Sequence, residues 1–308
     1  MASPVVSSAF VRLLDDRLRE VADKRYNELP TMIPEIFSVL KSEKAWEEFY
    51  NVVGPGDVPE FTGKLTYLEV HPGFHRKIEH KEYAAGMAFQ RKFLDDKRYS
   101  VLDDGVGMLM ESAQRTREKQ GVRAFAYGDS TAYDYMTTNE ENVALFSDSH
   151  TTKAGVSTSS GFDNLGTSSM TKTTIAATRI LMRKFKADNG QRIDMPDDFA
   201  LIVPDDLADT ANEIIGTPSG YETSASTKNM DYQRYRVIPW MRLSDHDTND
   251  WYMVCVSKMK RDLVWFDRVL PETNMTIDFD TFQVKDSVYF RNSYGFKDWR
   301  WGYKHVAS

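Results

Sequence analysis

Cysteine is almost absent from this sequence. The chain has a single cysteine, Cys255, so no disulfide bond can form within it. The flanking residues WYMVCVSK are typical of a strand, in which a thiol packs as a small apolar side chain. We therefore expect Cys255 to be structural and not a catalytic nucleophile.

Long apolar runs are also missing. The run FALIV at 199–203 is far shorter than the roughly 18 residues that a membrane-spanning helix needs. The N-terminal stretch MASPVVSSAFVRLLDD lacks the basic start of an export signal and reaches acidic residues before any long apolar run. These absences predict a soluble, non-secreted chain without membrane contact.

The sequence has no basic block. It carries 39 Lys and Arg residues against 46 Asp and Glu residues, a formal net charge of −7. A protein whose main task is to grip phosphate backbones gathers positive charge on one face. Sequence-specific reading of nucleic acid is therefore not expected.

The glycines of a nucleotide site are missing where such a site would lie. The stretch MPDDFALIVPDDLADTANEIIG at 195–216 predicts a buried strand that runs into a helix capped by Asp205 or Asp206. A phosphate site needs glycines at this junction, whereas here a proline removes a donor and two carboxylates repel phosphate. A soluble α/β enzyme with a ligand site near 199–216 is thus only an alternative.

Catalytic and metal-binding motifs are absent as well. The sequence contains no nucleophile elbow, no HExxH and no paired CxxC. The histidines within 71–80 share no face enforced by their spacing, and the segment 245–247 (Asp-His-Asp) has the composition of a turn. We predict no catalytic residue, no cofactor and no metal site.

The N-terminal segment 1–60 favours helices without a core of their own. Residues 9–27 place apolar side chains, among them Leu14 and Leu18, on one helical stripe. A second helix is predicted over 34–51, followed by the breaker Gly-Pro-Gly at 54–56. This much apolar surface is too small for independent folding, so the segment is expected to lie on another surface as an arm.

A polar hairpin is predicted next. Extended patterns at 64–70 and 76–83 flank HPGFH, whose proline and glycine suit a turn. The returning strand RKIEHKEY is too charged to cover a core, and an isolated two-stranded ribbon is marginal in water. The hairpin therefore needs a neighbouring surface, of its own chain or of another subunit.

The remaining pattern is α+β. Apolar spacing predicts a helix over 100–126, roughly 39 Å long, and another over 169–187, with a polar stretch of about 40 residues between them that is usually functional or mobile. Strands dominate from residue 232 onward, and aromatic side chains crowd the segment 279–303. Because the arm and the projecting hairpin each need another surface to pack on, this pattern is typical of a subunit that assembles with copies of itself.

Four stretches of the sequence are informative together: FTGKLTYLEVHPGFHRKIEHKEYAAGMAFQRKFLDDKRYSVLDD, LFSDSH, TKTTIAATRILMRKFKADNGQRIDMPDDFALIVPDDLADTANEI and YFRNSYGFKDWRWGYKH. In their order they resemble the major capsid proteins of tailed phages, with the Hong Kong ninety-seven-type fold shared with encapsulins, and most closely the Mu-like head subunit group. The first stretch resembles the extended loop and the entry into that family's long spine helix, and the other three resemble its axial-domain and C-terminal segments.

The resemblance implies a division of the chain and a function. It implies an N-terminal arm (1–60), an extended hairpin loop (61–98), a peripheral domain with the spine helix (99–168 and 271–308) and an axial domain (169–270). The implied function is self-assembly into pentamers and hexamers that form an icosahedral shell around packaged double-stranded DNA. An encapsulin-like compartment, which differs in its cargo, is the other structural alternative.

The resemblance also implies partners and a location. They are other copies of the chain, a portal, a candidate decoration protein and packaged DNA held by non-specific contacts, in a virion assembled in the host cytoplasm. Because only the short segment 1–60 precedes the hairpin, scaffolding is expected from a separate protein, unless the chain is already mature. No lysine–asparagine crosslink is predicted, because the spacing of Lys64, Lys77, Asn274 and Asn292 identifies no reacting pair.

Six residues are the predicted contacts between subunits. Four lie on the hairpin: Phe74, Arg76, Lys77 and Glu79. Two lie on the arm, Leu14 and Leu18, for which packing within the same subunit is the equally weighted alternative.

Overall fold

The computed structural model describes residues 7–68, 70–131, 136–216, 229–278, 280–281 and 283–307. Within these ranges the chain is α+β, and its strands form three sheets. The helices are α1 (Ser7–Glu28), α2 (Ile33–Ile36), α3 (Lys92–Asp95), α4 (Tyr99–Ala126), α5 (Lys172–Met182), α6 (Asp205–Gly216), α7 (Met241–Ser244) and α8 (Val256–Asp262). The strands are β1 (Ser38–Lys41), β2 (Trp46–Val53), β3 (His71–Glu79), β4 (Lys81–Gln90), β5 (Thr137–Asn139), β6 (Leu165–Gly166), β7 (Phe199–Val203), β8 (Arg236–Pro239), β9 (Trp251–Cys255), β10 (Leu263–Ile277), β11 (Gln283–Phe296) and β12 (Gly302–His305).

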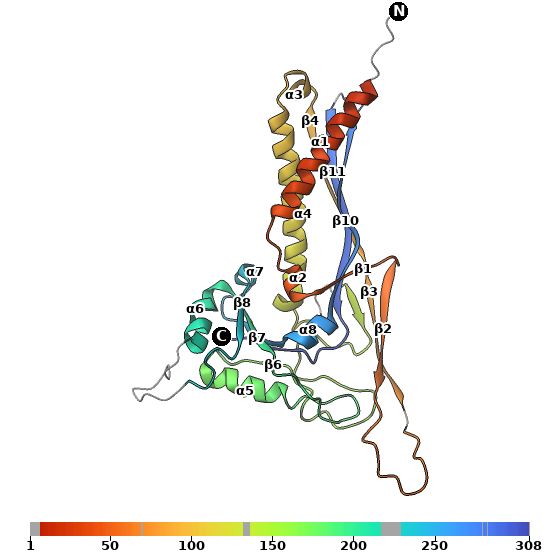
Figure 1. Ribbon diagram of the computed structural model, residues 1–308, viewed down its shortest axis with the longest axis vertical. Coiled ribbons are helices and arrows are strands. Elements are labelled where there is room, and N and C mark those ends of the chain that lie inside the picture. The colour runs from red at the N-terminus through yellow and green to blue at the C-terminus, as the bar shows by residue number, and fades with distance from the viewer. Residues whose placement is uncertain are drawn as a thin grey trace, which may run out of the picture.

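The elongated upper part of the molecule is a helix layer on a sheet (Figure 1). The sheet order is β1-β10-β11-β4, with β1 parallel to β10 and the other pairs antiparallel. The long helix α4 lies along this sheet, and α1 packs on α4 (Figure 1). Their shared core contains Leu102, Val106 and Leu109 of α4 with Leu18 of α1, so the helix predicted over 100–126 is confirmed. The helix predicted over 9–27 is confirmed by α1, and Leu18 of its apolar stripe is buried in this core.

A glycine lets the sheet approach this helix closely. A Cβ atom on Gly105 would lie 2.3 Å from the ring of Phe89 on β4, far inside contact distance. Gly105 therefore costs the helix some conformational stability but leaves room for an aromatic ring between helix and sheet.

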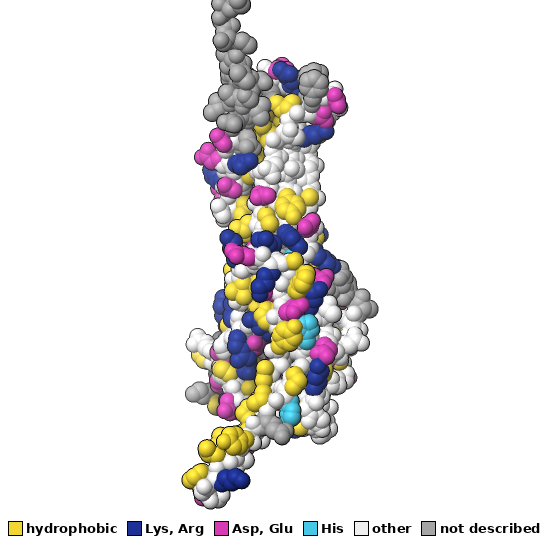
Figure 2. Space-filling view, turned by 90° about the vertical axis from the view of Figure 1, so that its right-hand side faces the viewer, with side chains coloured by type: hydrophobic (Ala, Val, Ile, Leu, Met, Phe, Trp, Pro, Cys, Tyr) yellow, Lys and Arg dark blue, Asp and Glu magenta, His cyan; other side chains and the backbone are white. Residues whose placement is uncertain are grey.

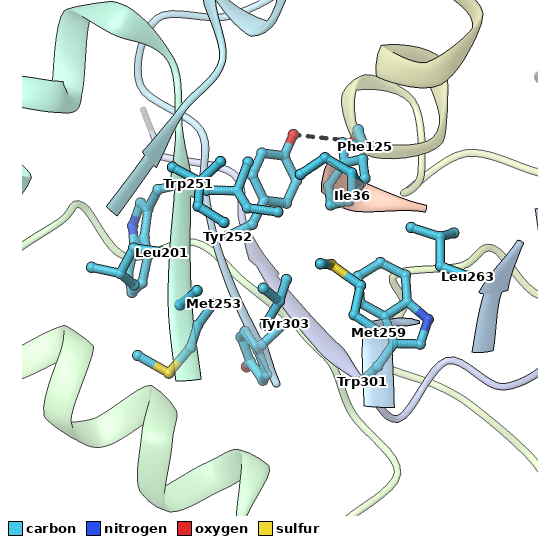
Figure 3. Close-up of a cluster of buried hydrophobic side chains, with 14 of the residues drawn as sticks. Ile36, Phe125, Leu201, Trp251, Tyr252, Met253, Met259, Leu263, Trp301 and Tyr303 are labelled. Atoms are coloured by element: carbon cyan, nitrogen blue, oxygen red, sulfur yellow. Dashed lines mark hydrogen bonds between the residues drawn. The ribbon is translucent and has the colours of Figure 1, made fainter. Parts of the chain in front are cut away.

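The compact lower part is built on the sheet β6-β12-β9-β7-β8. Every residue of β7 and β9 is buried, as the run FALIV predicted for its strand. Figure 3 shows Phe125, at the end of α4, packed close to Tyr252 and Trp301, and the Tyr252 hydroxyl donates a hydrogen bond to the Phe125 carbonyl at 3.1 Å. The aromatic residues near the C-terminus thus fill a core.

Cys255 ends strand β9 and is fully buried. Burial, aided by a hydrogen bond to Asp198, raises the pKa of its thiol to about 11. A thiol held protonated at neutral pH is a poor nucleophile. The prediction that Cys255 packs is confirmed.

The third sheet, in the order β2-β3-β5, corrects two predictions. Residues 34–51 form α2, β1 and most of β2 instead of one helix. The motif HPGFH lies inside β3 and makes no turn, because β3 pairs with β2 and the connecting loop is 54–70. The hairpin exists, but its first strand begins at Trp46 and not at residue 64 as predicted.

Two smaller expectations also change. Helix α5 ends at Met182, earlier than predicted, and carries a capping box in which Thr171 and Thr174 bond each other's backbone. Asp205 and Asp206 lie inside the first turn of α6, where carboxylates interact favourably with the helix dipole, and do not precede it as caps.

Candidate assembly surfaces

The β2–β3 ribbon has one face turned into the molecule and one turned outward. Trp46 is paired with Glu79, Phe49 with Arg76 and Tyr50 with His75. Since side chains alternate along a strand, Arg76 and Ile78 point inward and are buried, whereas Lys77 and Glu79 point to the other face.

Arg76 is fixed by partners within its own chain. Its side chain is 2% exposed, its Nη2 lies 3.3 Å from Glu141 Oε2, and its guanidinium lies 5.0 Å from the centre of the Phe296 ring. It also donates a hydrogen bond to the Lys297 carbonyl. Burial lowers the pKa of Arg76, opposed by the charges of Asp298 and Glu141.

Glu141 joins this ribbon to the segment that follows α4. Burial raises the pKa of Glu141, but hydrogen bonds from His150 and from the Thr151 backbone, with the charge of Arg76, outweigh it and lower that pKa overall. The His150 ring lies between Glu141 Oε1 and Asn164 Oδ1, 3.1 Å from each, and stacks on Trp299 at 4.0 Å. Through Glu141 and His150, the polar stretch after α4 is therefore attached to the ribbon by buried hydrogen bonds.

The outward face of the ribbon carries a row of aromatic and charged side chains. Trp46, Tyr50 and Val52 of β2 are exposed, Tyr50 by 70%. The Lys77 Nζ lies 4.5 Å from the centre of the Trp46 ring, and the Tyr50 ring lies 4.7 Å from that of His75. Figure 2 faces this side of the molecule and shows hydrophobic side chains among basic and histidine ones.

The loop between β2 and β3 extends this surface. At the lower tip of the molecule in Figure 2 hydrophobic side chains gather in contact with solvent. They include Phe61 and Leu65, and also Val58 and Tyr67, whose exposed fractions are 87% and 88%. A group of large apolar side chains exposed at such a tip is typical of an interaction surface. We call residues 54–68 the tip loop.

The six predicted contact residues fall into different places. Lys77 and Glu79 lie on the outward face and form an ion pair of 2.5 Å. Phe74 is half-buried, with the Lys153 Nζ 5.4 Å from its ring centre. Arg76 is buried among partners of its own chain, and Leu18 packs within its own subunit. Contacts of these two residues with another subunit stay predictions. The side chain of Leu14 lies outside the described part of the structure.

Sequence reasoning missed most of the outward-facing residues. Trp46 and Tyr50 fall within the helix predicted over 34–51 and Val52 lies just beyond it, although all three lie on one face of β2. The apolar spacing over 46–53 fits a helix as well as a strand, so the sequence alone carries no signal that singles these residues out.

Nowhere in the described residues do three His, Cys, Asp or Glu side chains gather as metal ligands would. His80 is buried between Ser293 and Ser42, at 2.8 and 3.0 Å, away from the outward-facing His75. No helix in the described ranges has the length and the apolar character to cross a membrane.

Solved structures share this fold at low sequence identity. The mature capsid of bacteriophage PhiM1 matches with a TM-score of 0.56 and 9% identity, over 91% of this chain and 88% of that one. The capsid of the empty GTA particle matches with a TM-score of 0.55 and 12% identity, over 91% of each chain. The bacteriophage JBD30 capsid matches with a TM-score of 0.53 and 13% identity, over 70% of this chain and 92% of that one. The fold is that of phage capsid proteins, the class predicted from the sequence.

The family model described as phage capsid protein matches residues 76–305. The chain therefore belongs to the phage capsid protein family and is a major capsid protein of a shell built from many copies, located in the virion. Membership implies a structural rather than an enzymatic role, and the alternative of a soluble enzyme is not favoured. No curated protein sequence matches the chain.

Proposed function

We propose that this capsid protein assembles into hexamers and pentamers that close an icosahedral shell around packaged double-stranded DNA. The observation that supports this proposal is the exposure of large apolar side chains on the tip loop and on the outward face of the ribbon in a single chain. Within a ring of subunits a neighbour covers this surface. Lys77 and Glu79 lie on it, and both remain proposed contacts together with Phe74.

Spreading contacts over an arm and a loop suits a closed shell. Each contact is modest, which allows misplaced subunits to leave during assembly, while many simultaneous contacts hold the finished shell. The elongated molecule in Figure 1, with its loop projecting from the lower end, can engage more than one neighbour.

The net charge agrees with enclosure of DNA without gripping it. A subunit with a charge of −7 repels nucleic acid overall, and confinement needs no base contacts. We therefore propose only non-specific contact between shell and DNA.

Further partners and boundaries are proposed from the family resemblance. They are a separate scaffolding protein, a portal, assembly in the host cytoplasm and membership of the Mu-like subgroup, with the arm, loop, peripheral and axial divisions given above. The JBD30 capsid is also described as decorated with minor capsid protein trimers, which supports a decoration protein as a candidate partner here.

The test is assembly of the purified chain, alone and with a scaffolding protein, followed by negative-stain microscopy and light scattering. Closed shells are expected from the parent chain and from Met230→Ser, a control at an exposed apolar residue outside the loop. The double variant F61S/Y67S is expected to fold, as judged by circular dichroism, and to form no shells at chain concentrations at which the parent chain assembles. Shells formed equally by this double variant would refute the proposed role of the tip loop.

A further inference from the structure

The segment Lys64–Leu68 within the tip loop has the composition of a strand but no partner. Its sequence KLTYL alternates polar and apolar side chains in its first four residues, and strand-favouring types predominate. The structure places it directly before β3 without assigning it to a strand. Among the described residues, no backbone hydrogen bond joins these five residues to another segment.

The hairpin itself cannot supply the partner. If β3 continued backwards through this segment, the opposite strand would be 54–60, with the sequence GPGDVPE. Its two prolines lack the N–H that a ladder needs, and its two glycines favour bends. The strand character of 64–68 is therefore unused within one chain.

Open sheet edges long enough to receive five residues are few. Of the strands that end the three sheets in the described part of the chain, β1, β5, β6 and β8 have four residues or fewer. Only β2, with eight residues, and β4, with ten, are longer. The edge of β2 carries Glu47 and Glu48, the kind of charge that protects an edge against strand addition.

The edge of β4 lacks such protection. It pairs with β11 along one side, and residues 84–88, with the sequence AAGMA, are all exposed and contain no charge and no proline. An unprotected edge of this length is a ready template for another strand. Its small side chains leave room for the larger Leu65 and Tyr67 of an incoming strand.

The geometry points to strand addition between subunits: Lys64–Leu68 of one copy pairs with the free edge of β4, at Ala84–Ala88, in a second copy. In Figure 1 the tip loop lies at the lower end of the molecule and β4 lies near the upper end, so the two cannot meet within one chain. Each half of the loop, about eight residues, can extend roughly 27 Å from the ends of β2 and β3. This inference rests on the proposed function, since it needs assembled subunits.

Disulfide trapping tests the pairing directly. The native cysteine is buried, so new thiols react without interference. Thr66→Cys is combined, in three separate variants, with Ala84→Cys, Ala85→Cys or Ala88→Cys, and shells are oxidised and run on denaturing gels without reductant. We expect a ladder of covalent oligomers for at least one combination. The control, T66C with Met230→Cys, is expected to give dimers at most.

The outcomes distinguish failure of the strand pairing from failure of the proposed function. Shells that form but give no ladder with any of the three positions overturn the strand pairing and leave the proposed function standing. If no variant and no parent chain forms shells, the proposed function fails and the pairing with it.

A backbone variant provides a second measurement. Thr66→Pro removes one N–H from the added strand, whereas Thr66→Ala removes the same side chain but keeps the N–H. We expect T66P to raise the chain concentration needed for assembly about 3- to 10-fold over T66A, because one hydrogen bond is lost at each contact. Equal thresholds for the two variants would overturn the pairing.

Discussion

Arg76 holds the base of the hairpin through a buried ion pair, although the sequence suggested a contact with another subunit. Replacing it by methionine keeps much of the side-chain volume but leaves Glu141 buried with one cation fewer. We expect R76M to lower the free energy of unfolding by about 3 kcal/mol, because a buried charge without its partner is costly. The measurement is urea unfolding of the unassembled chain.

Lys44→Met is the matched control for this change. Lys44 is 74% exposed and lies 3.4 Å from Glu47, so its ion pair is screened by water. We expect a change below about 1 kcal/mol. If R76M and K44M destabilised the chain equally, the buried pair would not be what fixes the ribbon.

His305 makes stability depend on pH in the acidic range. Burial lowers its pKa to about 4. The Ser168 backbone N–H donates to its Nδ1 at 3.2 Å, so the proton of the neutral ring sits on Nε2, which lies 2.8 Å from the Thr178 hydroxyl. Trp251 stacks on the ring at 4.3 Å and leaves no space for water on that side.

The sign of the effect follows from this neutral ring. Above the ordinary histidine pKa of about 6.5 both states are neutral, whereas between about 6.5 and 4 only the unfolded chain takes up the proton, so stability falls as the pH is lowered. Between pH 7 and pH 4 we expect the parent chain to lose roughly 3 kcal/mol more than His305→Gln, which cannot titrate. Unfolding free energies of both chains at the two pH values measure this, and parallel losses would contradict it.

At the scale of elements, the periodicity of the sequence predicted the helices and strands that bury an apolar stripe or run within the chain. It missed the strands whose formation depends on a partner strand. Helix α4 and the β7–α6 unit each bury a stripe or a run that is visible in the sequence. Residues 46–53 carry apolar side chains at spacings that fit a helix as well as a strand, and only the antiparallel partner β3 decides between them. The segment 64–68 was assigned to a strand for sound local reasons, but the hairpin offers it no partner.

Helix α1 is docked by few side chains, which makes its attachment easy to weaken. Of its described residues, Leu18 and Ala22 are buried in the shared core with α4, and the partly buried Tyr26 packs against that core. We expect Leu18→Ala to release the arm without unfolding the rest of the chain. Removing a buried leucine side chain costs about 2 to 5 kcal/mol, which is expected to exceed the free energy that holds α1 on α4.

Hydrogen exchange resolved along the chain measures this local release. In L18A, amides of residues 16–28 are expected to exchange at least tenfold faster, while those of β7 and β9 keep their protection. Lys24→Ala, at an exposed position on the same helix, is the control and should leave exchange unchanged. Faster exchange throughout the molecule would show that the arm is part of the central fold.

At the scale of the whole molecule, the sequence predicted the class of protein better than its contact residues. The structure has the predicted order of an N-terminal helix, a hairpin, a long helix and a strand-rich end. This order can be read from the sequence because each segment carries its own local pattern. Which hairpin side chains face outward depends on a strand register that turns over with a shift of one residue. Arg76 and Lys77 are neighbours in sequence, yet one is buried and the other lies on the outward face.

The surface that the chain leaves exposed also predicts how assembly responds to temperature. Burying Val58, Phe61, Leu65 and Tyr67 against a neighbour releases ordered water, and near room temperature this driving force is entropic. We expect the chain concentration needed for shell formation, measured by light scattering, to fall on warming from 10 to 30 °C. In F61S/Y67S this trend should be weaker even where some assembly persists at high concentration. A threshold in the parent chain that rises on warming would mean that polar contacts dominate, and the apolar tip loop would then not be the main source of cohesion.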